Sequence, residues 1–151
     1  MEFVVEYKFD GLGIALLYEH GKLVRALTRG DGQIGEDITL NVMEIANIPH
    51  TIPYTQTIEV RGEVVMPRGA FDELNARRLQ SGEKLFANPR NAASGSLRQL
   101  DPTVTRERDL LFFAYSCPDL EEIHKNSREE TGTYAALIKK LGIWGFNTSE
   151  Q

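Results

Sequence analysis

Two apolar runs separated by a short turn dominate the N-terminal part of this chain. The first covers residues 12–18 and the second residues 22–28, with Glu19-His20-Gly21 between them. This spacing predicts an antiparallel hairpin with glycine in the turn. Residues 3–7 alternate as a further strand, which places Lys8 at a strand end. Because a hairpin carries the chain out and back, we expect Lys8 and Arg29 at the same end of the sheet.

The rest of the chain predicts helices and strands in mixed order. Apolar alternation predicts strands over residues 58–66 and 110–115. Boundary residues predict four helices. The first begins at about Glu36, after a glycine-rich loop, and the second runs from Pro67 to Gly82. The third covers residues 90–99, after Asn88-Pro89, and the fourth follows a capping box at 127–130 and is closed by Gly142. This order indicates a single α+β domain, largely antiparallel sheet with flanking helices.

Composition excludes several classes of protein. With 151 residues and 41% hydrophobic content, the chain resembles an ordinary globular domain and has no apolar run long enough to cross a bilayer. The N-terminus lacks the features of a secretory signal, and Cys117 has no second cysteine for an internal disulfide, so we expect a cytoplasmic protein. One cysteine and three scattered histidines predict no structural metal site.

The charge is unevenly distributed along the sequence. A formal net charge of -5 argues against DNA binding by bulk electrostatics. However, residues 84–108 are rich in positive charge, whereas residues 119–130 are mainly acidic. Any contact with phosphate is therefore expected from the first stretch, which carries Lys84, Arg90, Arg98, Arg106 and Arg108.

Three motifs resemble those of one enzyme family. They are EYKFDG at residues 6–11, TRGDGQIGEDIT at 28–39 and FANPRNAASGSLRQLD at 86–101. Together they resemble the adenylation (nucleotidyltransferase) domain of bacterial NAD-dependent DNA ligases. The Lys-x-Asp-Gly pattern alone is also found in ATP-dependent DNA ligases, RNA ligases and messenger-RNA capping enzymes. The other two motifs favour the NAD-dependent branch, and the resemblance runs from Glu6 to Tyr115 and more weakly to Phe146.

The resemblance implies an ATP-grasp-like nucleotidyltransferase fold and chemistry at a lysine. Lys8 would take AMP from NAD, and a lysine amine suits this role because the phosphoramidate that it forms is readily cleaved again. A lysine is protonated at neutral pH, so its surroundings must lower its pKa before it can attack. Asp10 would orient Lys8 and accept a proton when a metal ion is bound. Magnesium is expected to assist each phosphoryl step.

The family also implies roles for nucleotide-binding residues. Glu6 would lie at the adenine end of the nucleotide, and Glu63, within Arg-Gly-Glu, would bind the ribose. The other expected contacts are Arg29 on the ribose, Arg90 and Arg98 on the phosphates of nicotinamide mononucleotide or DNA, and Tyr115 stacked on adenine. From pattern alone, Tyr115 could equally pack in the core, Glu63 could be a solvated strand residue, and each arginine could be an ordinary surface residue.

The sequence matches only part of the family's domain organisation. Later segments that supply two further lysines to the nucleotide are not recognisable, nor are the flanking modules, so we expect a truncated adenylation domain over residues 1–151. The partners implied are NAD and, through the full-length enzyme, nicked double-stranded DNA; the chain itself is expected to be a monomer. Two alternatives remain open: an ATP-dependent RNA ligase or capping-like transferase, and a non-catalytic nucleotide- or DNA-binding remnant.

Overall fold

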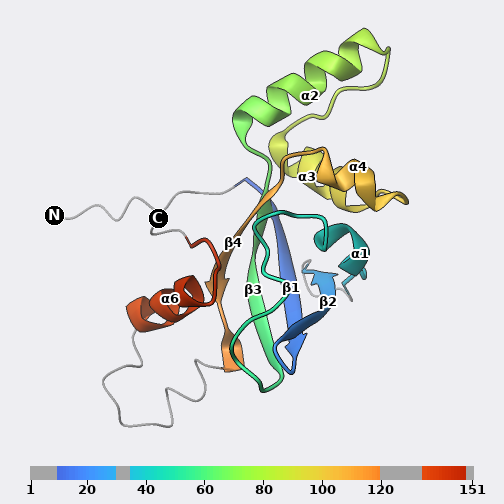
Figure 1. Ribbon diagram of the computed structural model, residues 1–151. Helices are drawn as coiled ribbons and strands as arrows, with labels where there is room; N and C mark the ends of the chain where they lie inside the picture. The colour runs from blue at the N-terminus through green and yellow to red at the C-terminus, as the bar shows by residue number, and fades with distance from the viewer. Residues whose placement is uncertain (1–9, 30–34, 120–133, 149–151) are drawn as a thin grey trace, which may run out of the picture.

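The chain folds around one four-stranded antiparallel sheet (Figure 1). The computed structural model describes residues 10–29, 35–119 and 134–148. The strand order is β2-β1-β3-β4, with β1 at Leu12–Glu19, β2 at Lys22–Thr28, β3 at Ile58–Val65 and β4 at Leu111–Ser116. This confirms the expected α+β class and the strands expected over 12–28, 58–66 and 110–115. The strand expected at 3–7 and the capping box at 127–130 lie outside the described residues.

The β1–β2 hairpin has the two-residue turn that its sequence predicts. His20 and Gly21 form the turn with φ angles of 50° and 79°. Positive φ at both central positions matches the twist of the flanking strands, and glycine adopts it without steric cost. Glu19, expected in the turn, is the last residue of β1 and pairs with Lys22.

Five described helices surround the sheet. Their bounds are α1 at Thr39–Val42, α2 at Arg68–Gln80, α3 at Pro89–Leu97, α4 at Pro102–Arg106 and α6 at Tyr134–Ile143. The expected cap of α3 is present, because Asn88 Oδ1 accepts a hydrogen bond of 2.8 Å from the Asn91 N–H. Helix α4 was not predicted, although Asp101-Pro102 has the same cap-and-proline signature, and Asp101 Oδ1 accepts from the Thr103 N–H at 3.0 Å.

Two helix boundaries were predicted wrongly. The helix expected from Glu36 begins at Thr39, because residues 36–38 run along β2: the Thr28 N–H donates to Glu36 O and the Ile38 N–H to Ala26 O, both at 2.9 Å. At the C-terminal end, Gly142 lies inside α6. The chain turns instead at Gly145, which has a φ of 102°.

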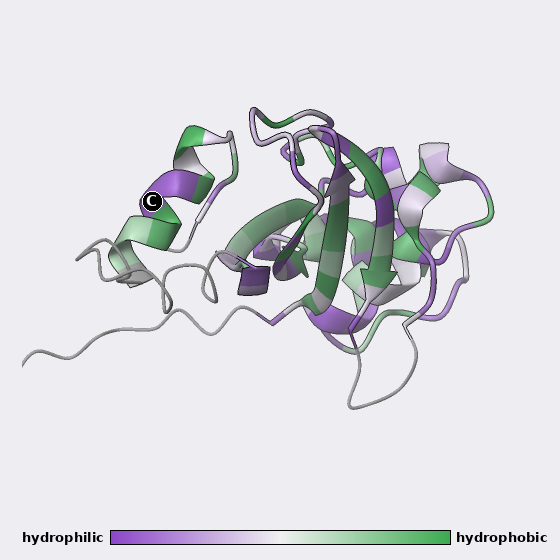
Figure 2. Cartoon of the chain, turned by 90° about the horizontal axis from the view of Figure 1, so that it is seen from below, coloured by the Kyte–Doolittle hydropathy of each residue, from purple (hydrophilic) through white to green (hydrophobic). Residues whose placement is uncertain are grey.

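The core lies on one face of the sheet. Along β1 and β3 the side chains alternate, so that Ile14, Leu16, Val60 and Val64 are fully buried while their neighbours are less so. The alternation is visible as green and purple bands along the strands in Figure 2. Helices α1, α3 and α6 contact the strands directly, whereas α2 contacts α3 and α4 contacts α1 and α3. No described helix is long and apolar enough to cross a membrane.

Candidate active site

The second face of the sheet carries the residues with predicted chemistry. Gly13 of β1 pairs with Glu63 of β3, and Glu63 pairs with Phe113 of β4. Arg29 extends this row beyond β2, because its N–H donates to Gly13 O at 2.8 Å. Residues paired across antiparallel strands project to the same side. The sheet therefore brings Arg29, Gly13 and Glu63 together on the face opposite the helices.

Gly11, the last residue of the Lys-x-Asp-Gly motif, lies directly against β3. Its N–H donates to Glu63 Oε1 at 3.2 Å. A Cβ atom on Gly11 would lie 2.3 Å from Val64 O and 2.9 Å from Glu63 Cγ, so only glycine allows this approach. Two motifs separated by 52 residues in sequence thus meet through one hydrogen bond.

Glu63 is a half-buried carboxylate in a charged neighbourhood. Burial raises the pKa of Glu63 above its usual value; the Gly11 N–H and the charge of Arg90 lower it, and Asp10 raises it further. Asp10 and Arg90 therefore lie near enough to act on the same carboxylate. A partly desolvated carboxylate with one oxygen fixed by a backbone N–H is well suited to accept hydrogen bonds from sugar hydroxyls.

Gly13 is a strand position without a side chain, and it lies between two predicted ligand-binding residues. A Cβ atom at Gly13 would lie 3.8 Å from Arg29 Cβ and 4.0 Å from Tyr115 Oη. Tyr115 is 37% exposed, so it is not a core residue, and its hydroxyl reaches toward β1. An aromatic ring beside a strand position without a side chain leaves space for a planar base.

The two arginines expected to bind phosphate lie at opposite ends of α3. Arg90 is in its first turn and acts on Glu63. Arg98, at the C-terminal end, donates to Glu36 Oε2 at 3.0 Å. A helix of this length separates its ends by about 12 Å. The structure therefore places Arg90 near Glu63 and Arg98 in an ion pair with Glu36.

Of the three remaining predicted site residues, the structure describes only Asp10. Glu6 and Lys8 lie outside the described residues. Asp10 is described and exposed, and it leads directly into Gly11. Sequence reasoning had passed over Gly11 and Gly13. The signals available were the glycine that ends Lys-x-Asp-Gly and a glycine inside an otherwise apolar strand, which often marks close approach of backbone or ligand.

The part of the chain that the structure describes has no group of three or more histidine, cysteine or acidic side chains able to hold a metal ion. Asp10 and Glu63 are nevertheless two neighbouring carboxylates, because the charge of Asp10 raises the pKa of Glu63. Magnesium is commonly held by one or two carboxylates together with substrate phosphates. These residues fit a metal ion that arrives with a nucleotide.

Comparison with known proteins decides between the families that share Lys-x-Asp-Gly. Residues 1–151 match the family described as the NAD-dependent DNA ligase adenylation domain. The chain belongs to this family. The DNA ligase of Alcanivorax borkumensis is 49% identical over the whole chain, and that of Fusobacterium nucleatum is 50% identical over 95% of it. The DNA ligase of Campylobacter lari is 58% identical over 76% of the chain.

These relatives are much longer than this chain. The aligned region spans 19%, 20% and 18% of the three ligases, or about a fifth of each. Membership of the adenylation-domain family confirms the resemblance seen in the three motifs and the NAD-dependent branch that the second and third motifs favoured.

Proposed function

We propose that this chain is the adenylate-forming part of an NAD-dependent DNA ligase and has the nucleotidyltransferase fold. Lys8 Nζ attacks the adenylyl phosphorus of NAD; a phosphorus–nitrogen bond forms, the bond to the other phosphate breaks, and nicotinamide mononucleotide leaves. The AMP then passes to the 5′-phosphate at a DNA nick, and the 3′-hydroxyl displaces it. The observation that carries the proposal is the meeting of Gly11 with Glu63, which brings the lysine motif to the ribose-binding motif.

The arrangement of residues on the second sheet face supports the nucleotide-binding roles. Adenine would lie over Gly13 and against Tyr115, with Glu6 at its far end. The ribose hydroxyls would be held by Glu63 and Arg29. The absence of a side chain at Gly13 and the raised pKa of Glu63 both support a ligand here, because a planar base could approach the strand closely and the ribose would meet a partly desolvated acceptor.

Phosphate recognition is assigned to the arginines and to Asp10. Arg90, beside Glu63, would contact the phosphate of nicotinamide mononucleotide, and Asp10 would orient the Lys8 amine. Arg98 would contact phosphate after its ion pair with Glu36 breaks. Both side chains of this pair are exposed, so breaking it costs little free energy. Magnesium bound with the substrate would neutralise the negative charge that develops on the phosphates. We expect the protein to act as a cytoplasmic monomer.

The test is the intact mass of the protein after incubation with NAD and magnesium. A gain of one AMP from NAD, absent with ATP and absent in Lys8→Ala, is the expected result. A gain from ATP would instead indicate an RNA-ligase or capping-like transferase. An unchanged mass, with NAD still binding to both proteins, would indicate a non-catalytic binding remnant. An adduct that persists in Lys8→Ala would exclude Lys8 as the nucleophile.

A further inference from the structure

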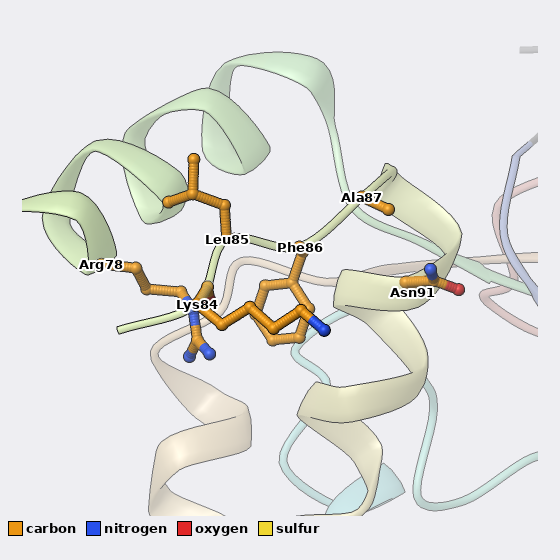
Figure 3. A pocket seen from close by; sticks show the side chains of 6 residues that line it. All are labelled: Arg78, Lys84, Leu85, Phe86, Ala87 and Asn91. Carbon is orange, nitrogen blue, oxygen red and sulfur yellow. The ribbon is translucent and has the colours of Figure 1, made fainter. Parts of the chain in front are cut away.

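A recess lies between α2 and the N-terminal turn of α3, next to Arg90 in the sequence (Figure 3). It is a cavity of about 290 Å³ formed by one α2 residue, the connecting segment and the first turn of α3. The nucleotide-binding roles above do not use it. Its lining residues are Arg78, Lys84, Leu85, Phe86, Ala87 and Asn91.

One of its cations is held rigidly. The Nε–H of Arg78 donates to Lys84 O at 2.7 Å, and the guanidinium lies 4.3 Å from the centre of the Phe86 ring. Its Nη1 is 3.8 Å from a carboxylate oxygen of Glu83, which is too long for a strong ion pair. Figure 3 shows the Arg78 guanidinium and the Lys84 side chain beside the Phe86 ring. The lining therefore presents an oriented arginine that is only weakly neutralised.

Arg108, which is repelled by Arg78, has an unsatisfied donor. Its Nη1 is buried and has no hydrogen-bond partner among the described residues. Burial lowers the pKa of Arg108, and repulsion from Arg78 and Arg77 lowers it further, while Glu83 and Glu107 act in the opposite direction. Buried donors in native proteins are normally paired. Arg108 does not line the cavity, but an anion bound beside Arg78 would reduce the repulsion between these arginines.

The surroundings favour an anion over an aromatic ligand. One face of Phe86 is occupied by Arg78, and α3 crowds its edge, since a Cβ atom on Gly95 would lie 3.0 Å from Phe86 Cε1. The face of the ring that Arg78 covers is therefore not free to stack on a base. The dipole of α3, whose first turn forms one wall, adds a favourable field for negative charge.

We propose that this cavity is a subsite for a backbone phosphodiester of the DNA on which the chain acts. The inference rests on the proposed function, because a DNA strand whose 5′-phosphate receives the AMP held at Glu63 would continue past Arg90 and the first turn of α3. Arg90 and Asn91 are consecutive: the first acts on Glu63 and the second lines the cavity. A free phosphate has the same chemistry, so the experiment must distinguish the two sources.

The test compares Lys84→Gln and Arg108→Gln with Lys139→Gln. Lys84 and Lys139 are both exposed and their substitutions remove the same charge, but Lys139 lies on α6, away from the cavity. Affinity for a fluorescent nicked duplex is measured by anisotropy over a range of salt concentrations. Loss of one phosphate contact should weaken binding about tenfold at 50 mM salt and reduce the slope of log K against log salt by about 0.9. Lys139→Gln should match the wild type.

The outcomes separate this inference from the proposed function. Lys84→Gln and Arg108→Gln should both still gain AMP from NAD, since neither residue belongs to the nucleotide site. Unchanged DNA affinity and slope in both variants, or a wild-type chain that does not bind the duplex, would overturn the subsite. If these substitutions weaken the binding of inorganic phosphate and leave the DNA affinity unchanged, the cavity is a free-anion site instead. Cavity-dependent DNA binding without any AMP adduct would support the subsite and contradict the proposed lysine chemistry.

Discussion

Replacing Gly11 with alanine tests how the lysine motif is seated on the sheet. The new Cβ would lie 2.3 Å from Val64 O, where 3.4 Å is an ordinary contact, so one group must move by about 1 Å. Val64 cannot easily yield, because β3 is paired with β1 on one side and β4 on the other. We therefore expect Gly11→Ala to lower the free energy of unfolding by about 3 kcal/mol, the upper end of the range for overpacking substitutions.

The measurement is thermal unfolding followed by circular dichroism. For a domain of this size, about 3 kcal/mol corresponds to a fall in Tm of roughly 6–12 °C. Gly13→Ala provides the matched control, because its nearest new contact is 3.6 Å. Its Tm should stay near that of the wild type while AMP adduct formation falls, since the methyl group enters the space assigned to adenine.

A further control is Gly69→Ala in α2, where a Cβ atom meets nothing within 4 Å. Helix propensity predicts that this variant is more stable by up to about 1 kcal/mol. If Gly11→Ala proved as stable as Gly13→Ala, the close approach of Gly11 to β3 would be refuted. The proposal that this contact aligns the lysine motif with Glu63 would then lose its basis.

Other predictions concern charge, capping and metal. Burial raises the pKa of the Glu63 carboxyl group in the folded protein. The contribution of Glu63 to the free energy of unfolding is therefore most favourable at low pH and is lost as the pH rises through the raised pKa. Glu63→Gln should remove this dependence in urea unfolding measured from pH 4 to 7, while adduct formation falls; an unchanged pH profile would contradict it. Arg108→Met should not lower Tm, because it removes an unsatisfied buried donor and repulsion between cations; a clear loss would show an undetected partner. Asn88→Ala should cost about 1 kcal/mol by removing the bond to the Asn91 N–H, and an unchanged Tm would argue against this cap. Chelation of magnesium should abolish the AMP adduct, and an adduct formed in excess chelator would exclude the metal.

Local structure was predicted well wherever neighbouring residues determine it. The hairpin followed from apolar alternation around His20-Gly21, because only a turn with positive φ joins such strands closely. The start of α3 followed from Asn88-Pro89, because the side chain caps the helix and proline needs no hydrogen bond there. The Asp101-Pro102 pair has the same local information and was simply overlooked.

Boundaries set by distant partners could not be predicted in this way. Residues 36–38 resemble the first turn of a helix, but hydrogen bonds to Ala26 and Thr28 keep them extended along β2. Likewise, Arg98 was grouped with Arg90 by motif, yet Glu36 binds it at the other end of α3. In both cases the deciding partner is remote in sequence, so no local pattern reveals it.

The sequence by itself determined the family and the chemistry expected of it, because motif residues and their spacing are one-dimensional properties. Only the tertiary structure decided which of those residues meet. Gly11 touches Glu63 because β1 and β3 pair in one particular register, and a slip of one residue would turn Glu63 to the core face. The repulsion of the unsatisfied Arg108 by Arg77 and Arg78 of α2 likewise arises only in the fold, because these residues are about thirty positions apart in the sequence. Charge and burial of this kind arise from three-dimensional proximity, which residue order alone does not specify.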